Sequence, residues 1–357
     1  MKGQIVSFGY KPEKAVRAFS LDHEYVWDGA VIYENGLYHM FCSAWPDRLG
    51  FGHNWLFNSR IIRAVSKTPT GPFSYAGTVL ERRGNGFFDG MNTHNTCIRK
   101  WRDRFYLYYM GTSYTGTPPV AGETVPEERI LEVWNSKRIG VAVSDHIEGP
   151  YLRADRPLLN PREAPYWDRT AITNPAVTIL EDGTTYMIYK SRRDKGCPLQ
   201  LGVAVAPAPD GPFERLCDGP ILEMKDENKH IEDPFLWYDE NKKLFCILAK
   251  DDPKNGSPGI TGMWGSGFYA QSRDCITFDI PDHPCVYTRR VSWLDGHETV
   301  QGNLERPWLL FDGQGKPEYL YCASGAGQIP YAFEDRTFVI CQKLVPDEED
   351  SRQLPTT

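Results

Sequence analysis

The sequence of 357 residues lacks any run of about 18 apolar residues, the length that a membrane-spanning helix needs. It also lacks a run of lysine and arginine, and its formal net charge of -7 is unfavourable for binding nucleic acid phosphates. Neither a membrane nor a nucleic acid is therefore expected as a partner. Residues 1–14 contain no apolar segment of a secretion signal. This predicts a cytoplasmic protein, or a periplasmic one if a signal has been removed.

Cysteine occurs in an odd number and without any spacing typical of a bound metal. The nine cysteines form no CxxC pair, so neither a zinc site nor a disulfide framework is indicated. We expect most of them to be buried thiols. Aromatic residues, in contrast, make up 13% of the chain, with 10 Trp and 19 Tyr. Such side chains suit β-sheets and the faces of bound sugars, so the composition favours strands over helices.

A recurring segment links a β-branched strand to a Gly-Pro-aromatic turn. Three copies are clear and a fourth is degenerate: IIRAVSKTPTGPF (61–73), IGVAVSDHIEGPY (139–151), LGVAVAPAPDGPF (201–213) and FYAQSRDCITFD (268–279). Alternating small and β-branched residues that lead into glycine and proline are typical of a β-hairpin. Each copy therefore predicts the two outer strands of a sheet.

A second recurring segment lies upstream of these hairpins and has five copies. It begins with a polar residue, continues as an apolar strand and a turn, and ends in an aromatic strand. The copies are DGAVIYENGLYHMF from Asp28, NTCIRKWRDRFYLYY from Asn95, NPAVTILEDGTTYMIY from Asn174, DPFLWYDENKKLFCIL from Asp233 and RPWLLFDGQGKPEYLY from Arg306. Most of the turns carry the Asn, Asp and Gly that tight hairpins need. Each copy thus predicts the two inner strands of a sheet.

Five inner hairpins, most of them followed by an outer hairpin, predict an all-β fold: a five-bladed β-propeller with four-stranded antiparallel blades. Radial closure removes exposed sheet edges. We expect a single domain over residues 1–357, with the terminal segments closing the ring. The blades are expected at roughly 25–80, 90–155, 170–217, 230–290 and 300–345. A β-sandwich is the alternative fold, and residues 126–137 are the best helical segment.

The same repeat predicts where a binding site lies. The inner strand of each blade lines the central channel, and its antiparallel partner returns the chain to the same end. The starts of the inner strands therefore converge on one face, with Asp28, His94, Asn95, Asn174, Glu232, Asp233, Glu305 and Arg306. Three long loops, 43–60, 189–196 and 249–267, open on this face. Long loops on a rigid scaffold usually carry function, so this end is the predicted pocket.

Clustered carboxyl groups suit hydrolysis of a glycosidic bond. The reaction needs one protonated and one ionised carboxyl, and repulsion between clustered carboxylates separates their pKa values. Blades that face each other across a pocket favour a separation of about 6.5–9.5 Å, which predicts inversion of configuration. A structural interpretation stays open for each candidate, because Asp or Asn before a strand often only caps a turn.

In these segments the chain resembles the five-bladed propeller glycoside hydrolases, above all family 43. The segment WDGAVIYENGLYHMF is similar to the family's first blade, which implies that Asp28 is the general base, and HIEDPFLWY implies that Glu232 is the general acid. The family's third carboxylate aligns with Asn174, whose amide cannot supply the charge. Either Asp233 replaces that carboxylate, or the catalytic set is arranged differently.

The other arrangement resembles family 117, which combines an aspartate base with a second aspartate and a histidine or glutamate from the last blade. This resemblance implies His297 and Glu305 as catalytic candidates. Asp28 ranks first as the base. Glu232 or Asp233 follows as acid or modulator, and His297 and Glu305 come last.

Substrate contacts are expected from Trp27, Trp45, His94, Asn95, Asn174, Lys190, Arg192, Glu298 and Arg306. Tryptophans stack on sugar faces, and Trp55 and Trp264 are further candidates. Lys190 and Arg192 follow the third inner hairpin, so an acidic sugar is one candidate substrate, since arginine binds uronate or sulfate in a bidentate manner. His94 either bonds within the protein or holds a metal ion or a sugar hydroxyl.

Together these features predict an exo-acting glycoside hydrolase that removes a terminal sugar from an oligosaccharide. The chemistry requires no cofactor. A divalent ion on the propeller axis is compatible with it, although no ligand set specifies one. Two alternatives stay open. One is a phosphorylase on the same scaffold, which needs a cluster of Arg, Lys and His for phosphate. The other is a propeller that binds carbohydrate without catalysis. The sequence indicates no particular oligomeric state.

Overall fold

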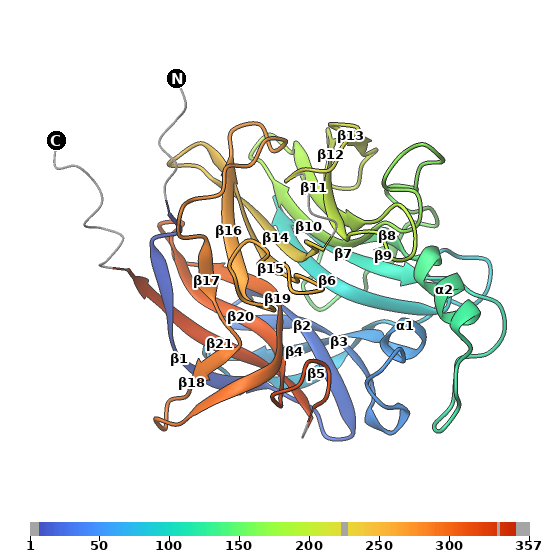
Figure 1. The fold of residues 1–357 in the computed structure, drawn as a ribbon, viewed down its shortest axis with the longest axis horizontal. Helices are drawn as coiled ribbons and strands as arrows, with labels where there is room; N and C mark the ends of the chain where they lie inside the picture. The colour runs from blue at the N-terminus through green and yellow to red at the C-terminus, as the bar shows by residue number, and fades with distance from the viewer. Residues whose placement is uncertain (1–6, 223–227, 334–335, 348–357) are drawn as a thin grey trace.

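The computed structural model describes residues 7–222, 228–333 and 336–347, which form five antiparallel sheets around a common axis (Figure 1). The prediction of an all-β, five-bladed propeller is confirmed. Four blades consist of four consecutive strands, and the innermost strand comes first in the chain. Each of these blades therefore starts at the axis and ends at the outside of the ring.

The first two blades cover residues 24–153. The first contains β2 (Glu24–Glu34), β3 (Leu37–Pro46), β4 (Arg60–Ser66) and β5 (Ser74–Leu80). The second contains β6 (Asn92–Trp101), β7 (Arg104–Thr112), β8 (Arg138–Ser144) and β9 (Leu152–Arg153). Neighbours in each order are hydrogen-bonded.

The third and fourth blades repeat this arrangement. The third contains β10 (Thr173–Ile179), β11 (Thr185–Ser191), β12 (Gln200–Ala206) and β13 (Glu214–Arg215). The fourth contains β14 (Ile231–Asp239), β15 (Leu244–Asp251), β16 (Gly267–Ser272) and β17 (Cys285–Tyr287).

The fifth sheet joins the two ends of the described chain. It contains β18 (Arg290–Ser292), β19 (Glu298–Phe311), β20 (Pro317–Ala326) and β21 (Thr337–Pro346), together with β1 (Tyr10–Phe19) from the start of the chain. The strand order is β1-β21-β20-β19-β18. β1 lies beside β21 at the outer edge (Figure 1). The early strand thus completes the last blade and closes the ring through main-chain hydrogen bonds.

Every innermost strand contains a β-bulge at the same place. The register of strand pairing shifts there in all five blades. At each bulge one residue adopts a left-handed conformation, namely Asp28 (φ 69°), Asn95 (56°), Asn174 (53°), Asp233 (52°) and Arg306 (56°). These are the five residues with which the second repeat begins. A bulge places two residues of one strand opposite one residue of its partner, so two consecutive side chains can face the channel instead of alternating.

Helical segments are short and lie in loops. The β3–β4 loop contains η1 (Asp47–Leu49) and α1 (Trp55–Asn58), and the β7–β8 loop contains α2 (Glu127–Ser136), close to the predicted helix. Apolar side chains pack between the blades, with Phe41, Tyr108 and Tyr189 in one large cluster. Apolar contact therefore holds the sheets together, and the polar starts of the inner strands stay available at one end of the axis.

Candidate functional site

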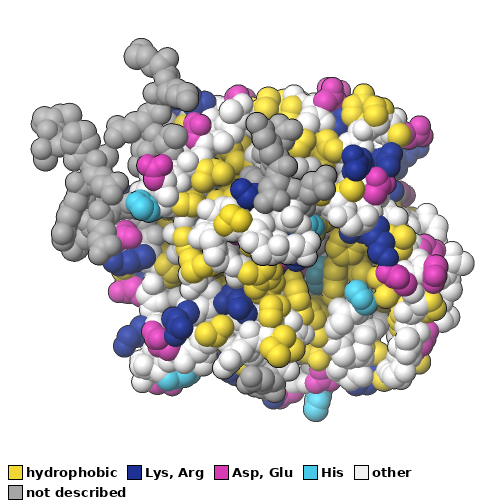
Figure 2. Space-filling view, in the orientation of Figure 1, with side chains coloured by type: hydrophobic (Ala, Val, Ile, Leu, Met, Phe, Trp, Pro, Cys, Tyr) yellow, Lys and Arg dark blue, Asp and Glu magenta, His cyan; other side chains and the backbone are white. Residues whose placement is uncertain are grey.

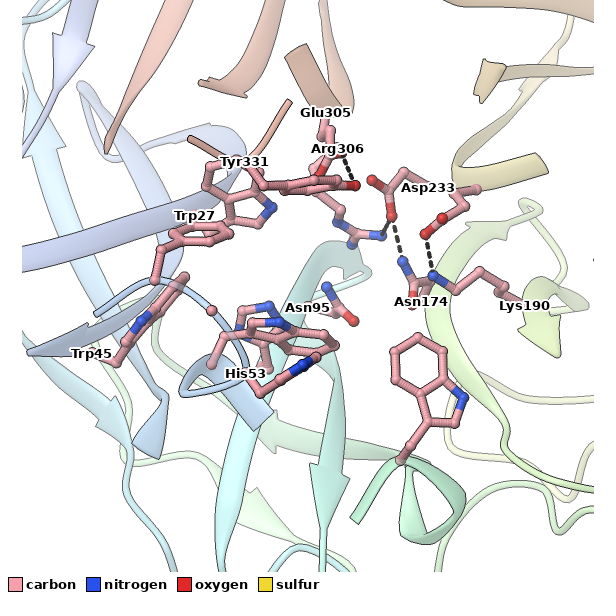
Figure 3. A pocket seen from close by; sticks show the side chains of 16 residues that line it. Trp27, Trp45, His53, Asn95, Asn174, Lys190, Asp233, Glu305, Arg306 and Tyr331 are labelled. Carbon is pink, nitrogen blue, oxygen red and sulfur yellow. Dashed lines mark hydrogen bonds and ion pairs between the residues drawn. The ribbon is translucent and has the colours of Figure 1, made fainter. Parts of the chain in front are cut away.

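A cavity of about 370 Å³ lies at the end of the axis where the inner strands begin. Figure 2 shows a hollow in the middle of this face with hydrophobic side chains along it. The volume falls within the range of small-molecule sites. The cavity is lined by Trp27, Trp45, Phe51, Gly52, His53, Trp55, His94, Asn95, Trp134, Asn174, Lys190, Glu232, Asp233, Glu305, Arg306 and Tyr331. Its walls come from all five blades and from the loops that carry α1 and α2, as Figure 3 shows in part.

Four of the five bulge residues line the cavity floor, and all five are linked in a ring that the Thr173 hydroxyl closes between Asn174 and Asn95. The Arg306 guanidinium donates from Nε to Asp28 Oδ1 at 2.7 Å, and its Nη1 lies 3.6 Å from Asp233 Oδ1. Asn174 Nδ2 donates to Asp233 (Figure 3), and Asn95 Nδ2 donates to Asp28 Oδ1 at 3.4 Å. One cation therefore bridges two carboxylates across the axis, and two amides support them from the neighbouring blades.

The two glutamates beside this ring are each held by a lysine. Lys190 Nζ on β11 donates to Glu232 Oε2 at 2.5 Å. Lys250 Nζ on β15 donates to Glu305 Oε1, which also accepts from Asn303 Nδ2 at 2.6 Å and from the Tyr331 hydroxyl at 2.8 Å. Each lysine lies on the second strand of the preceding blade. The second strands thus supply the cations that fix the carboxylates of the next blade.

The carboxylates of the pocket differ in protonation. Burial raises the pKa of Asp233 to about 6, and the negative charges of Glu305 and Glu232 act in the same direction. Arg306 and Lys190 attract the carboxylate and offset only part of this increase. Burial also opposes ionisation of Glu232, but the ammonium groups of Lys190 and Lys250 outweigh it and lower the pKa of Glu232. Asp233 can therefore carry a proton at mildly acidic pH while Glu232 is ionised. A pocket with one carboxyl of each kind can supply both an acid and a base.

Asp28 lies beneath the cavity floor and does not line the cavity. Its side chain accepts hydrogen bonds from Ser43, Asn95 and Arg306 and is only 2% exposed. Burial opposes its ionisation, but Arg306 and these donors lower its pKa. The structure therefore corrects the expected placement of Asp28 at the pocket wall, because Arg306 and Asn95 lie between its carboxylate and the cavity.

His94 lies in an aromatic corner of the pocket. Its ring is 5.0 Å from the ring of Trp55 and 5.7 Å from that of Trp45, and its Nδ1 is 2.9 Å from Ser59 Oγ. Burial lowers the pKa of His94 to about 4, so the imidazole is neutral near pH 7. Within the described residues, no three His, Cys, Asp or Glu side chains gather in a way that could hold a metal ion.

Two of the predicted catalytic and binding residues lie away from the pocket. His297 and Glu298 belong to the β18–β19 hairpin, where His297 contacts Asp295 and Glu298 Oε1 accepts from Ser292 Oγ at 2.7 Å. Both side chains are more than half exposed. The expectation failed because β19 already begins at Glu298, well before Glu305, so its first residues are far along the strand from the bulge.

Arg192 and Trp264 also stay outside the cavity lining. The guanidinium of Arg192 lies against the Trp134 ring, and the Trp264 indole donates to Asp252 Oδ1 at 2.5 Å. Both residues thus support the wall from behind. The remaining predicted site residues line the cavity: Trp27, Trp45, Trp55, His94, Asn95, Asn174, Lys190, Glu232, Asp233, Glu305 and Arg306.

Several lining residues were not predicted individually. Phe51 and His53 lie in the long 43–60 loop, Trp134 lies on α2, and Tyr331 lies in the β20–β21 connection. Their common sequence signal is an aromatic or histidine side chain in the segment that follows a second strand. Such a rule finds Tyr331 in GQIPYAF and Trp134 in LEVWNSK.

No described helix is long and apolar enough to span a membrane.

Several solved structures with the same fold are glycoside hydrolases, and their sequence identity to this chain is low. A family 117 glycoside hydrolase from the marine bacterium Zobellia galactanivorans is 16% identical, with a TM-score of 0.64 over 96% of this chain and 93% of that one. A thermostable family-43 glycoside hydrolase is 14% identical, with a TM-score of 0.61 over 94% of each chain. The β-xylosidase RS223 is 14% identical, with a TM-score of 0.58 over 91% of this chain and 94% of that one.

No protein-family model and no curated protein matches the sequence. At identities of 16% or less, the likeness to these structures is a likeness of fold. The chain is thus a five-bladed β-propeller that resembles the glycoside hydrolases of families 117 and 43 over nearly its whole length.

Proposed function

We propose that the protein is a glycoside hydrolase that removes a terminal sugar from an oligosaccharide. The observation that carries the proposal is the cavity itself, in which six aromatic side chains face three carboxylates of unlike environment. Aromatic rings bind the apolar faces of sugars, and hydrolysis of a glycosidic bond needs a protonated and an ionised carboxyl. The fold shared with family 117 and family-43 glycoside hydrolases supports the same reaction class by analogy.

Asp233 is the proposed general acid, because its raised pKa keeps a proton on it at mildly acidic pH. Glu232 is the proposed base. It is ionised, and its side chain is 16% exposed, compared with 8% for Glu305 and 5% for Asp233, so it is the carboxylate that water reaches most easily. Asn174 and Arg306 hold Asp233 from two sides. Asp28 is then a positioning residue that fixes Arg306 rather than the base itself.

Exo action and inversion of configuration are parts of the same proposal. The cavity is bordered by side chains from the β3–β4 loop, from α2 and from the β20–β21 connection, and a pocket enclosed in this way accommodates a chain end better than a chain interior. Inversion is proposed because a water molecule that gives its proton to Glu232 can attack the anomeric carbon directly while Asp233 protonates the leaving-group oxygen. The first anomer formed, observed by NMR during hydrolysis, reports the stereochemistry.

The test is a screen of aryl glycosides and oligosaccharides with the wild type and Asp233→Asn, with and without phosphate. We expect a free monosaccharide as the product of the wild type, no dependence on phosphate, and loss of turnover in the variant. Release of a sugar phosphate only when phosphate is present would indicate a phosphorylase instead. Binding of oligosaccharide without turnover under any condition would contradict the proposal and support a non-catalytic propeller.

A further inference from the structure

Three cationic side chains surround Trp134 on one wall of the pocket. Lys137 Nζ lies 3.1 Å from the centre of the Trp134 ring, the Arg192 guanidinium 4.7 Å, and Lys190 Nζ 5.9 Å. Trp134 is on α2, Lys137 follows that helix directly, and the other two lie at the end of β11 and in the loop after it. Trp134 and Lys190 line the cavity, and Lys137 and Arg192 lie against the Trp134 ring outside that lining, so the charge of this cationic wall borders the sugar site.

Only one of these three cations has a carboxylate partner among the described residues. Lys190 is paired with Glu232, whereas no described carboxylate lies within 4.0 Å of Lys137 or Arg192. Lys137 is 1% exposed, and Arg192 Nε is buried without a hydrogen-bond partner. Buried charges in proteins are normally paired, because an ion that loses its hydration without gaining a partner destabilises the folded state.

The neighbourhood of these side chains carries an excess of positive charge. Burial and the charges of Lys190 and Arg192 lower the pKa of Lys137 well below its ordinary value, although Glu232 and Asp233 act in the opposite direction. Burial also lowers the pKa of Arg192. An anion placed against this wall would relieve both effects, since it would bring negative charge closer to Lys137 and Arg192 than Glu232 and Asp233 do.

Resting on the glycosidase function proposed above, we propose that the cationic wall of Lys137, Lys190 and Arg192 around Trp134 is a subsite for the carboxylate of an acidic sugar, such as a hexuronic acid. The ring of the sugar then lies among the aromatic side chains of the cavity, and its carboxylate points toward the wall. A neutral sugar of the same size leaves Lys137 and Arg192 without a close anion.

A single negative charge fits this wall better than the double charge of phosphate. Glu232, Asp233 and Glu305 line the same cavity, so a dianion beside them would meet more repulsion than a carboxylate does. We therefore assign the wall to a group carried by the substrate rather than to free phosphate.

Binding of free monosaccharides by isothermal titration calorimetry tests the subsite without any need for turnover. The wild type is titrated with galacturonate, glucuronate, galactose and glucose. We expect at least one hexuronate to bind at least tenfold more tightly than the neutral hexose of the same configuration. Lys137→Met and Arg192→Gln should each remove most of that preference. Arg193→Gln is the matched control, because the Arg193 side chain is 60% exposed and lies beside Arg192.

The outcomes separate the subsite from the catalytic proposal. Equal affinity for hexuronates and hexoses in the wild type, or a preference that survives in both folded variants, would overturn the subsite. Thermal unfolding checks folding, and Arg192→Gln serves as the second variant if Lys137→Met does not fold. Phosphate binding that depends on Lys137, without any preference for hexuronates, would also overturn it. A hexuronate preference without hydrolysis of any aryl glycoside leaves the subsite intact and contradicts only the glycosidase.

Discussion

Asp28 and Asp233 occupy the same place in the first and fourth blades, yet the protein treats the two carboxyl groups in opposite ways. Both start an inner strand, both adopt a left-handed conformation at a β-bulge, and both contact Arg306. The pKa of Asp28 is lowered and that of Asp233 is raised to about 6. Both are buried, so burial alone does not explain the difference.

The difference lies in the neighbours that the adjoining blades supply. Arg306 is 2.7 Å from Asp28 but 3.6 Å from Asp233. Asp28 also accepts from a serine hydroxyl and an amide, whereas Asp233 lies near two further carboxylates. Hydrogen bonds to an anion lower its pKa, and like charges raise it. The repeat thus gives the position of a carboxyl group, and the non-repeated side chains around it determine its protonation and its role.

The largest effect is expected from Asp233→Asn, which removes the proposed proton donor. Loss of a general acid typically costs 10²–10⁴ in rate, so we expect kcat to fall about 10³-fold for glycosides with a poor leaving group. A dinitrophenyl glycoside needs little protonation and should lose much less. The measurement is kcat across a series of aryl glycosides, with the exposed Asp103→Asn in the β6–β7 turn as control. Equal losses for all leaving groups would remove Asp233 from the acid role.

Asp28→Asn tests the other member of the pair. The amide keeps a hydrogen-bonding side chain but leaves the buried Arg306 without its closest anion. Removing one partner of a buried ion pair typically costs about 3–5 kcal/mol, and we expect a loss of about 3 kcal/mol in urea unfolding. Activity should fall roughly tenfold through displacement of Arg306 and Asp233. A folded variant without any activity toward activated glycosides would instead make Asp28 the base.

The two aspartates should also influence the pH dependence of stability in opposite directions. The folded pKa of Asp233, about 6, is above its ordinary value of 3.8, so its stabilising contribution is present below pH 3.8 and is lost as pH rises through 6. The folded pKa of Asp28 is below 3.8, so its contribution is present above that value and is lost on acidification.

Urea unfolding between about pH 3 and 7.5 measures this contrast. Relative to Asp233→Asn, the wild type should lose stability as pH rises from about 4 to 7. Relative to Asp28→Asn, it should gain stability as pH rises from about 3 to 5. If the unfolding free energy of the wild type ran parallel to that of both variants over this pH range, the environments of Asp28 and Asp233 would be equivalent. The same titration of Asp233 should lower kcat of the wild type as pH rises above about 6.

The sequence was sufficient to predict the fold and the convergence of the five strand-start residues on one face, because both depend on local repeats. The polar residue at each strand start and the turn residues of each hairpin recur five times, and closure of five such units leaves little choice of architecture. Most of the predicted pocket residues line the cavity for the same reason. The repeat also made Asp28 and Asp233 look equivalent at the sequence level.

What the sequence could not predict depends on non-local contacts. Side-chain packing across blades places Arg306 over Asp28 and hides Asp28 from the cavity. The path of the β7–β8 loop, which no repeat constrains, brings Trp134 into the pocket. The resemblance to family 117 points to the segment of His297 and Glu298, but the length of β19 before the bulge, which separates this segment from the pocket, follows no repeat in the sequence.

The smallest effect is therefore expected from His297→Ala and Glu298→Gln. Both side chains are exposed on the β18–β19 hairpin and contact only that hairpin or its flanking residues in the described structure. Surface substitutions of this kind usually change stability by about 0.5 kcal/mol or less, and we expect kcat and KM within twofold of wild type. Steady-state kinetics on a sugar that the wild type hydrolyses gives the answer. A loss of more than tenfold in either variant would mean that the hairpin closes over the pocket during turnover, and it would return the last blade to the catalytic set that the family 117 resemblance implies.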